Sequence, residues 1–146
     1  MPTVFIQAPP SRIFRAMCDL TRHAKWAAHD VTIKARQRGR PSVGMRYTSA
    51  HDRNEEPDRL TVTELTRNER FGFHVVMPNG WELDFAMTVE AQEDGTLVTR
   101  KAKMGKMPGT SFLTRLIVPL VGNVHEKKFL DNMKAELEGT ASFRPS

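Results

Sequence analysis

Apolar and polar residues alternate with a period of two through most of the middle of the chain. In the segment 81–89 the apolar residues share one side, and polar residues hold most of the other: the apolar members are Trp81, Leu83, Phe85, Met87 and Val89. This pattern is typical of a strand with one buried face and one face in water. Shorter runs of the same kind predict strands near residues 3–7, 31–36, 45–49, 60–66, 71–75 and 96–104. We therefore expect six or seven antiparallel strands joined by short connections, with a hairpin turn at Asn79 and Gly80.

Helical spacing appears at the two ends of this strand region. Apolar residues at positions 13, 14, 17 and 20 predict a first short helix, and a second is expected over Thr21 to Trp26. A long helix is predicted from Thr110 or Ser111, with one apolar stripe through Leu113, Ile117, Leu120 and Val124 and another through Leu130, Met133 and Leu137. The two stripes are out of step. Pro119 and Gly122 lie between them, so a kink or break is expected there.

These elements predict a single α+β domain covering residues 1–146, with residues 139–146 as a loose tail. The length and the hydrophobic content of 39% are sufficient for a buried core. The first ten residues lack the features of a signal peptide, and no apolar run reaches the roughly 20 residues of a membrane span. Cys18 is the only cysteine, which excludes an internal disulfide and indicates a small buried residue. We expect a cytoplasmic protein.

The net charge of +5 gathers in two basic patches, at residues 34–40 and 100–106. Such patches are ordinary solvated surface or attract RNA, a ribosome or an acidic membrane. Nucleic acid is the less favoured partner, because no aromatic residue interleaves with Lys34 to Arg40 to stack on bases. The charge says nothing about the oligomeric state.

The usual motifs of catalysis and cofactor binding are absent from the sequence. The five histidines show no metal-binding spacing, and there is no serine-hydrolase elbow, no phosphate-binding P-loop and no dinucleotide fingerprint. We therefore predict neither a metal nor an organic cofactor.

The opening segment VFIQAPPSRIFRAMCDLTRHAKW, together with Val43-Gly44 and Gly95-Thr96, resembles the START-like or Bet v 1-like (SRPBCC) superfamily. The resemblance extends from Val4 to about Glu138 and is closest to the bacterial polyketide cyclase/dehydrase-like branch. It implies a helix-grip fold, in which an antiparallel sheet wraps around a long C-terminal helix after two short helices. It also implies a cavity between sheet and helix that different members use for lipids, sterols or polyketides, and sometimes for catalysis.

The expected cavity wall consists of residues on inward faces. The candidate ligand-binding residues are Trp26, Tyr47, Phe73, Trp81, Phe85, Met87, Arg100, Leu120 and Met133. The apolar members could instead pack a solid core. The Tyr47 hydroxyl is expected either to enter the cavity or to reach water, and His74 is expected to point outward. No catalytic residue is assigned.

Arg100 has three interpretations, because strand alternation places it on the apolar side with Val98 and Ala102. It could extend to the rim of the cavity, pair internally with Glu64 or another acid, or bind an anionic group of a ligand. The leading function is a carrier or sensor for a hydrophobic small molecule. The alternatives are a cyclase or dehydratase acting in the same cavity, and binding of RNA, a ribosome or an acidic membrane through the basic patches.

Overall fold

A computed structural model describes residues 2–28, 30–51 and 56–139 of the chain, and only the backbone of residues 119–121 and 139. The predicted loose tail falls almost entirely outside the described residues.

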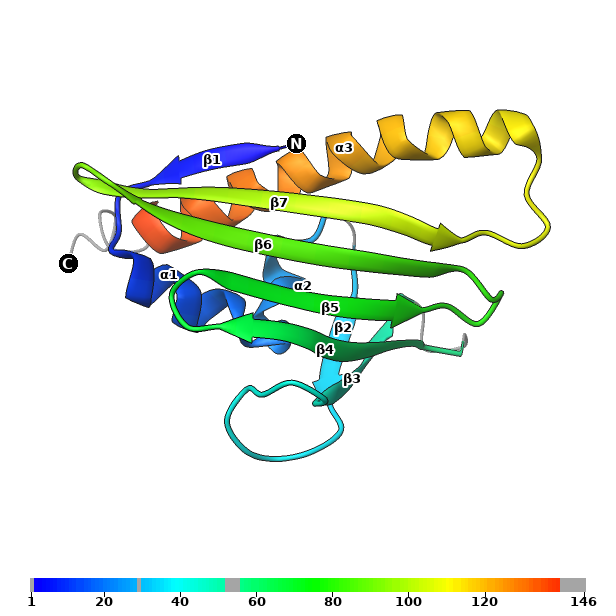
Figure 1. Cartoon of the computed structure of the whole chain (residues 1–146), viewed down its shortest axis with the longest axis horizontal. Coiled ribbons are helices and arrows are strands. Elements are labelled where there is room, and N and C mark those ends of the chain that lie inside the picture. The colour runs from blue at the N-terminus through cyan, green and yellow to red at the C-terminus, as the bar shows by residue number, and fades with distance from the viewer. Residues whose placement is uncertain (1, 29, 52–55, 140–146) are drawn as a thin grey trace.

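One antiparallel sheet forms the frame of the molecule, and it confirms the predicted α+β class (Figure 1). Its strands follow the order β1-β7-β6-β5-β4-β3-β2, so every pair except β1 with β7 joins neighbours in the sequence. The strands are β1 (Thr3–Ile6), β2 (Thr32–Ala35), β3 (Arg46–Ala50), β4 (Asp58–Thr66), β5 (Arg70–Val76), β6 (Glu82–Gln92) and β7 (Gly95–Lys106). The seven strands agree with the upper of the two predicted numbers.

Two short helices follow β1, as expected, and a long helix closes the chain. They are α1 (Pro10–Met17), the short 3-10 turn η1 (Leu20–Arg22) with α2 (His23–Trp26), and α3 (Phe112–Lys134), which continues into the π-helical turn η2 (Ala135–Gly139). Ser111 caps α3, because its hydroxyl accepts the backbone N–H of Thr114 at 3.2 Å.

The helices pack on one face of the sheet and bury the core there. In Figure 1, α3 runs along the β1 and β7 side of the sheet, while α1 and α2 lie behind β4, β5 and β6. Side chains from both layers are fully buried between them, among them Ile6, Ile13, Met17, Leu20, Phe71, Met87, Val98, Leu130 and Met133. This arrangement is the predicted helix-grip fold.

Of the predicted kink or break in the long helix, the break is wrong, because α3 is one uninterrupted helix across Pro119 and Gly122. A continuous helix keeps one face toward the sheet along its whole length. Leu130 and Met133 lie on the face of α3 that packs against the sheet. Nearer the start of the helix, the same face carries Val118 and not the residues of the first predicted stripe. The first stripe is therefore left on the outside, where Leu113, Ile117 and Val124 are exposed.

A β-bulge in β4 changes which residues face the core. Val62 is buried, but the register shifts between Val62 and Glu64, so that the next core-packed residue is Leu65, opposite Phe71. Because the bulge adds one residue, Glu64 no longer shares the side of Val62. Glu64 instead forms a partly exposed ion pair with Arg70, at 3.3 Å.

Candidate ligand cavity

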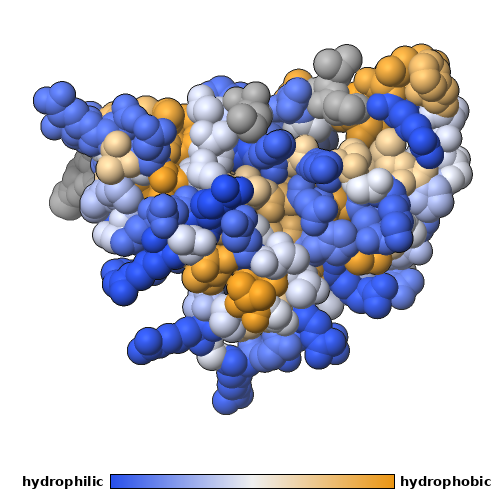
Figure 2. All heavy atoms as spheres, viewed as in Figure 1, coloured by the Kyte–Doolittle hydropathy of each residue, from blue (hydrophilic) through white to orange (hydrophobic). Residues whose placement is uncertain are grey.

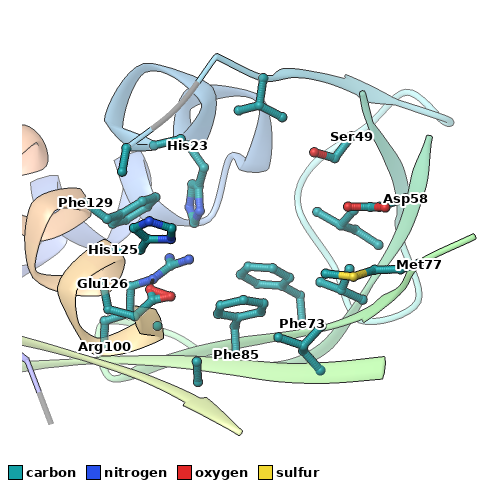
Figure 3. Close-up of a pocket in the computed structure, with 18 of the residues that line it drawn as sticks. His23, Ser49, Asp58, Phe73, Met77, Phe85, Arg100, His125, Glu126 and Phe129 are labelled. Carbon is teal, nitrogen blue, oxygen red and sulfur yellow. Dashed lines mark hydrogen bonds and ion pairs between the residues drawn. The ribbon is translucent and has the colours of Figure 1, made fainter. Parts of the chain in front are cut away.

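A cavity of about 550 Å³ lies between the inner face of the sheet and the helices α2 and α3 (Figure 3). Apolar side chains make up most of its wall, and polar groups lie at two separate places. The lining residues are Leu20, His23, Ala27, Ala28, Val31, Ile33, Ser49, His51, Asp58, Leu60, Phe73, Val75, Met77, Leu83, Phe85, Arg100, Ala102, Lys103, Met104, Val118, Gly122, Asn123, His125, Glu126 and Phe129.

Strand alternation and helical spacing explain why these residues meet. On β5 and β6 the inward positions carry Phe73, Val75, Leu83 and Phe85, and the rings of Phe73 and Phe85 stack with their centroids 5.0 Å apart. On α3 the cavity residues recur about one helical turn apart, at 118, at 122 and 123, at 125 and 126, and at 129. This spacing keeps them on one face of the helix.

Polar side chains occupy both ends of the cavity in Figure 3, with the two stacked rings between them. We call one the α3 end, formed by His23, Arg100, His125, Glu126 and Phe129. The other, the β4 end, contains Ser49 and Asp58, and here His51 Nε2 lies 3.1 Å from Asp58 Oδ2.

Arg100 and Glu126 form a buried ion pair at the α3 end. The guanidinium Nε of Arg100 donates to Glu126 Oε2, and both side chains are more than nine-tenths buried. The guanidinium carbon lies 3.7 Å from the ring centroid of Phe129 and 4.9 Å from that of Phe85, which are cation–π distances. Burial lowers the pKa of Arg100, and the carboxylate of Glu126 opposes that shift. An arginine nevertheless stays charged in proteins. The Arg100–Glu126 pair therefore consists of one positive and one negative charge, and its net charge is zero.

His23 is the second polar group of the α3 end, and its protonation follows from its hydrogen bond. Its Nε2 lies 2.7 Å from the backbone carbonyl oxygen of Met17. A carbonyl only accepts, so Nε2 carries the proton and Nδ1 is a free acceptor. Burial, followed by the charge of Arg100, lowers the pKa of His23 to about 3, so the ring is neutral at physiological pH. Nδ1 is buried and has no hydrogen-bond partner among the described residues.

Three of the candidate ligand-binding residues predicted from the sequence line this cavity: Phe73, Phe85 and Arg100. Trp26, Met87 and Met133 are instead packed in the core, each at most 1% exposed. Their positions on inward faces are as expected, but the packing between sheet and helices buries them completely. The side chain of Leu120 lies outside the described residues.

Tyr47 and Trp81 lie elsewhere, and both expectations need correction. Tyr47 is buried, and its hydroxyl contacts Met45 Sδ at 3.9 Å, so it reaches neither the cavity nor water. Trp81 precedes β6 and belongs to the hairpin turn, where its N–H donates to Asn79 Oδ1 at 3.0 Å. The strand that the sequence predicts from Trp81 begins at Glu82 in the structure. Its pairing with β7 shifts by one residue between Glu82 and Leu83.

Arg100 matches its second interpretation, although with a different partner from the one named. It is 6% exposed and paired internally, which excludes the rim position. The acid is Glu126 of α3 rather than Glu64, because the bulge in β4 turns Glu64 away from Arg100. Arg100 also lines the cavity, where a ligand can contact it, but its charge is already paired with Glu126, so the geometry does not favour the third interpretation, binding of an anionic group.

Sequence reasoning missed His23, Glu126 and Phe129. Glu126 precedes Leu130 by four positions and Met133 by seven, so it lies on the apolar stripe of the helix, where a charged residue is unusual. His23 precedes Trp26 by three positions on a short helix and therefore shares its buried side. An acid and a histidine at core positions were the available signals.

Within the described residues there is no group of three or more histidine, cysteine, aspartate or glutamate side chains that could hold a metal ion. Of the helices formed by these residues, none is long and apolar enough to cross a membrane.

Comparison with known sequences gives one family match. Residues 7–116 match the model of the family described as Activator of Hsp90 ATPase homolog 1-like protein. No curated protein matches the chain.

Several solved structures share the fold. The di-domain ARO/CYC protein StfQ from the steffimycin biosynthetic pathway is 12% identical, with a TM-score of 0.73 over 96% of this chain and 50% of that protein. The Aha1 dimer from Colwellia psychrerythraea is 23% identical, with a TM-score of 0.58 over 93% of this chain and 92% of the other. Ara h 8.0201 is 13% identical, with a TM-score of 0.65 over 91% and 92%. At these identities the likeness concerns the fold.

Proposed function

The chain belongs to the Activator of Hsp90 ATPase homolog 1-like family, within the SRPBCC superfamily, and from this premise we propose that it binds a hydrophobic small molecule in its cavity, as a carrier or sensor. The observation that carries the proposal is the cavity of about 550 Å³ with apolar walls and a few polar groups at its ends. Small-molecule sites typically have volumes of roughly 300–1,000 Å³ and this distribution of polarity.

The stacked rings and aliphatic side chains between the two polar ends support a largely apolar ligand. Water held against Phe73, Phe85, Val75 and Leu83 finds no hydrogen-bond partners on those side chains. An apolar molecule that displaces it gains burial of about 25 cal/mol for each Å² removed from water. The polar groups at the ends would then orient the ligand.

Filling the cavity tests this proposal directly. We suggest Ala102→Trp, which places a large ring in the wall of β7, and as matched control Ala86→Trp on β6, which is outside the cavity lining. Native mass spectrometry of protein purified from its own host should detect a bound molecule in the wild type and in the control, but not in Ala102→Trp. A bare protein in all three samples, together with no binding of any apolar dye, would contradict the proposal.

The buried polar groups of the α3 end favour a second candidate, a cyclase or dehydratase acting in the same cavity. Such an enzyme needs a pocket that orients a reactive chain and a group that moves protons. His23 and the Arg100–Glu126 pair meet in one place, but a histidine with a pKa of about 3 is a weak base at neutral pH. We therefore rank binding first. Faster closure of a linear diketone to a cyclohexenone, with loss of water, would favour the enzyme if His23→Phe removed the acceleration.

The outer side of α3 favours an additional role, attachment to an anionic membrane surface. Phe112, Leu113, Leu116 and Ile117 are 78%, 65%, 55% and 47% exposed at the start of the helix, and apolar surface gathers in the corresponding corner of Figure 2. Arg115 and Lys106 lie beside this apolar stripe, and the chain has no acidic residue between Asp94 and Glu126. An apolar helix face with basic neighbours matches an anionic bilayer.

Vesicle flotation tests the membrane role. Wild type should float with vesicles containing phosphatidylglycerol, and Leu116→Glu should not. Val43→Glu is the matched control, because Val43 is also an exposed apolar residue, at 61%, but lies in the segment between β2 and β3. Concentration-dependent dimerisation that Leu116→Glu removes, without flotation of the wild type, would assign the stripe to a second copy of the chain instead.

A further inference from the structure

The α3 end of the cavity carries specific information about the ligand. We infer that the ligand is a neutral, mostly apolar molecule whose inner end carries a hydroxyl group, and that this hydroxyl donates a hydrogen bond to Nδ1 of His23. The inference rests on the proposed ligand-binding function and adds the chemical class to it.

The first argument is the unpaired acceptor. His23 Nε2 is held by the carbonyl oxygen of Met17 at 2.7 Å, which leaves the lone pair of Nδ1 without a partner among the described residues. Figure 3 shows the imidazole directed into the cavity on the side of Arg100. Buried acceptors in folded proteins are almost always paired, so an unpaired one on a residue that lines a cavity indicates a place for a donor from a ligand. An alcohol, phenol or enol supplies that donor.

The rings around His23 fix the direction of this acceptor. Its imidazole lies 5.2 Å from the ring centroid of Phe129 and 5.8 Å from that of Phe73, both in edge-on geometry. Trp26 packs against it as well, at 5.3 Å. Because three aromatic neighbours and the Met17 carbonyl hold the ring, it cannot turn to satisfy Nδ1 internally without losing its Nε2 hydrogen bond.

The second argument concerns charge, and it excludes an anionic head group at this end. Arg100 already has its counter-charge in Glu126, so a ligand carboxylate would bring a second negative charge beside Glu126 into a buried site. It would also meet the lone pair of neutral His23 rather than a donor. Protonation of His23 would relieve that conflict, but burial and the neighbouring guanidinium both oppose it. Two other basic side chains line the cavity, Lys103 and His125. Both residues are exposed to solvent, and His125 lies at the α3 end in Figure 3, but neither replaces Glu126 as the partner of Arg100.

Three matched probes test the inference: β-naphthol, its methyl ether and β-naphthoate, each titrated into the wild-type protein by calorimetry. We expect β-naphthol to bind about tenfold more tightly than the ether, which is the ordinary value of one hydrogen bond, and naphthoate to bind least. His23→Phe should abolish the difference in affinity between naphthol and ether. His74→Phe, the same substitution on the outer face, should leave all three affinities unchanged.

The outcomes separate the inference from the function on which it rests. Equal affinities of the wild type for naphthol and ether would overturn the inference while cavity binding stands. Tightest binding of naphthoate would also overturn it, in favour of anion recognition by Arg100. Failure of every probe to bind would overturn both. If His23→Phe does not fold, the nitrogen NMR signal of Nδ1 in the wild type decides: it should shift with naphthol and stay unchanged with the ether.

Discussion

Arg100 of β7 and Glu126 of α3 form an ion pair that joins the sheet to the long helix inside the wall of the cavity. Both residues therefore hold the sheet and the helix together and also line the candidate site. Loss of one charge leaves the other buried without a partner, and this situation is strongly destabilising.

Removing Arg100 alone should destabilise the protein. For Arg100→Leu we expect the free energy of unfolding in urea to fall by about 3–5 kcal/mol, and the double variant with Glu126→Leu to recover most of it. The control is Arg70→Leu at the partly exposed pair with Glu64, where about 1 kcal/mol or less is expected. An Arg100→Leu variant as stable as the wild type would show that the pair does not hold sheet and helix together.

Two phenylalanines on neighbouring strands should respond differently to truncation. Phe71 is fully buried in the core, so Phe71→Ala should lower the free energy of unfolding by about 3–5 kcal/mol. Phe85 borders the cavity and is only partly buried, so Phe85→Ala should cost less stability but weaken binding of apolar ligands. Asp84→Ser on the outer face should cost only its partly exposed contact with His74, about 1 kcal/mol or less. Equal effects of Phe85→Ala and Asp84→Ser would contradict the assigned register of β6.

The pH dependence of stability should contain a contribution from His74 on the outer face. Its ring nitrogens lie 2.7 Å from Asp84 Oδ1 and 2.8 Å from Glu82 Oε1, and the hydrogen bond to Asp84 is the main cause that raises its pKa. A raised pKa means that the stabilisation is fully present below the ordinary value of about 6.5 and is lost as pH rises through the folded-state pKa. His74→Gln should therefore lower the melting temperature more at mildly acidic than at mildly alkaline pH. A uniform decrease across the range would exclude this charge effect.

Cys18 should be unreactive in the native protein. It is buried, and burial raises the pKa of its thiol to about 12, so almost no thiolate exists at neutral pH. A thiol reagent such as Ellman's reagent should label it only as fast as the protein unfolds, and denaturant should make labelling immediate. Rapid labelling of folded protein would contradict the buried position.

The first turns of α3 should exchange their amide hydrogens faster than the last ones. The apolar side chains of Phe112, Leu113, Leu116 and Ile117 are exposed, whereas Leu130, Met133 and Leu137 are buried against the sheet. Fewer buried contacts mean a lower free energy of local opening. Hydrogen exchange followed by mass spectrometry measures the difference. Equal protection of both halves would contradict this difference in local stability.

Much of the fold was predictable from local patterns. Alternation along β5 and β6 indicated which residues face inward, and Phe73 and Phe85 accordingly lie on the cavity wall. Arg100 was recognised as a charged residue on a buried face because its neighbours at positions 98 and 102 are apolar. These inferences succeed because a strand has a fixed period of two, so that each residue's side of the sheet follows from its neighbours.

The partners of those residues depend on packing over long distances. The bulge between Val62 and Glu64 interrupts the period of β4, and the continuity of α3 through Pro119 brings Glu126 rather than an outer apolar residue toward Arg100. His23 comes from a helix of four residues, where its spacing from Trp26 indicates a buried side but not which groups it meets there. The sequence by itself determined the order of elements, the faces of the longer strands and the buried charge. Only the tertiary structure decided which acid neutralises that charge and where the unpaired Nδ1 of His23 lies, because both depend on how separate elements pack in three dimensions.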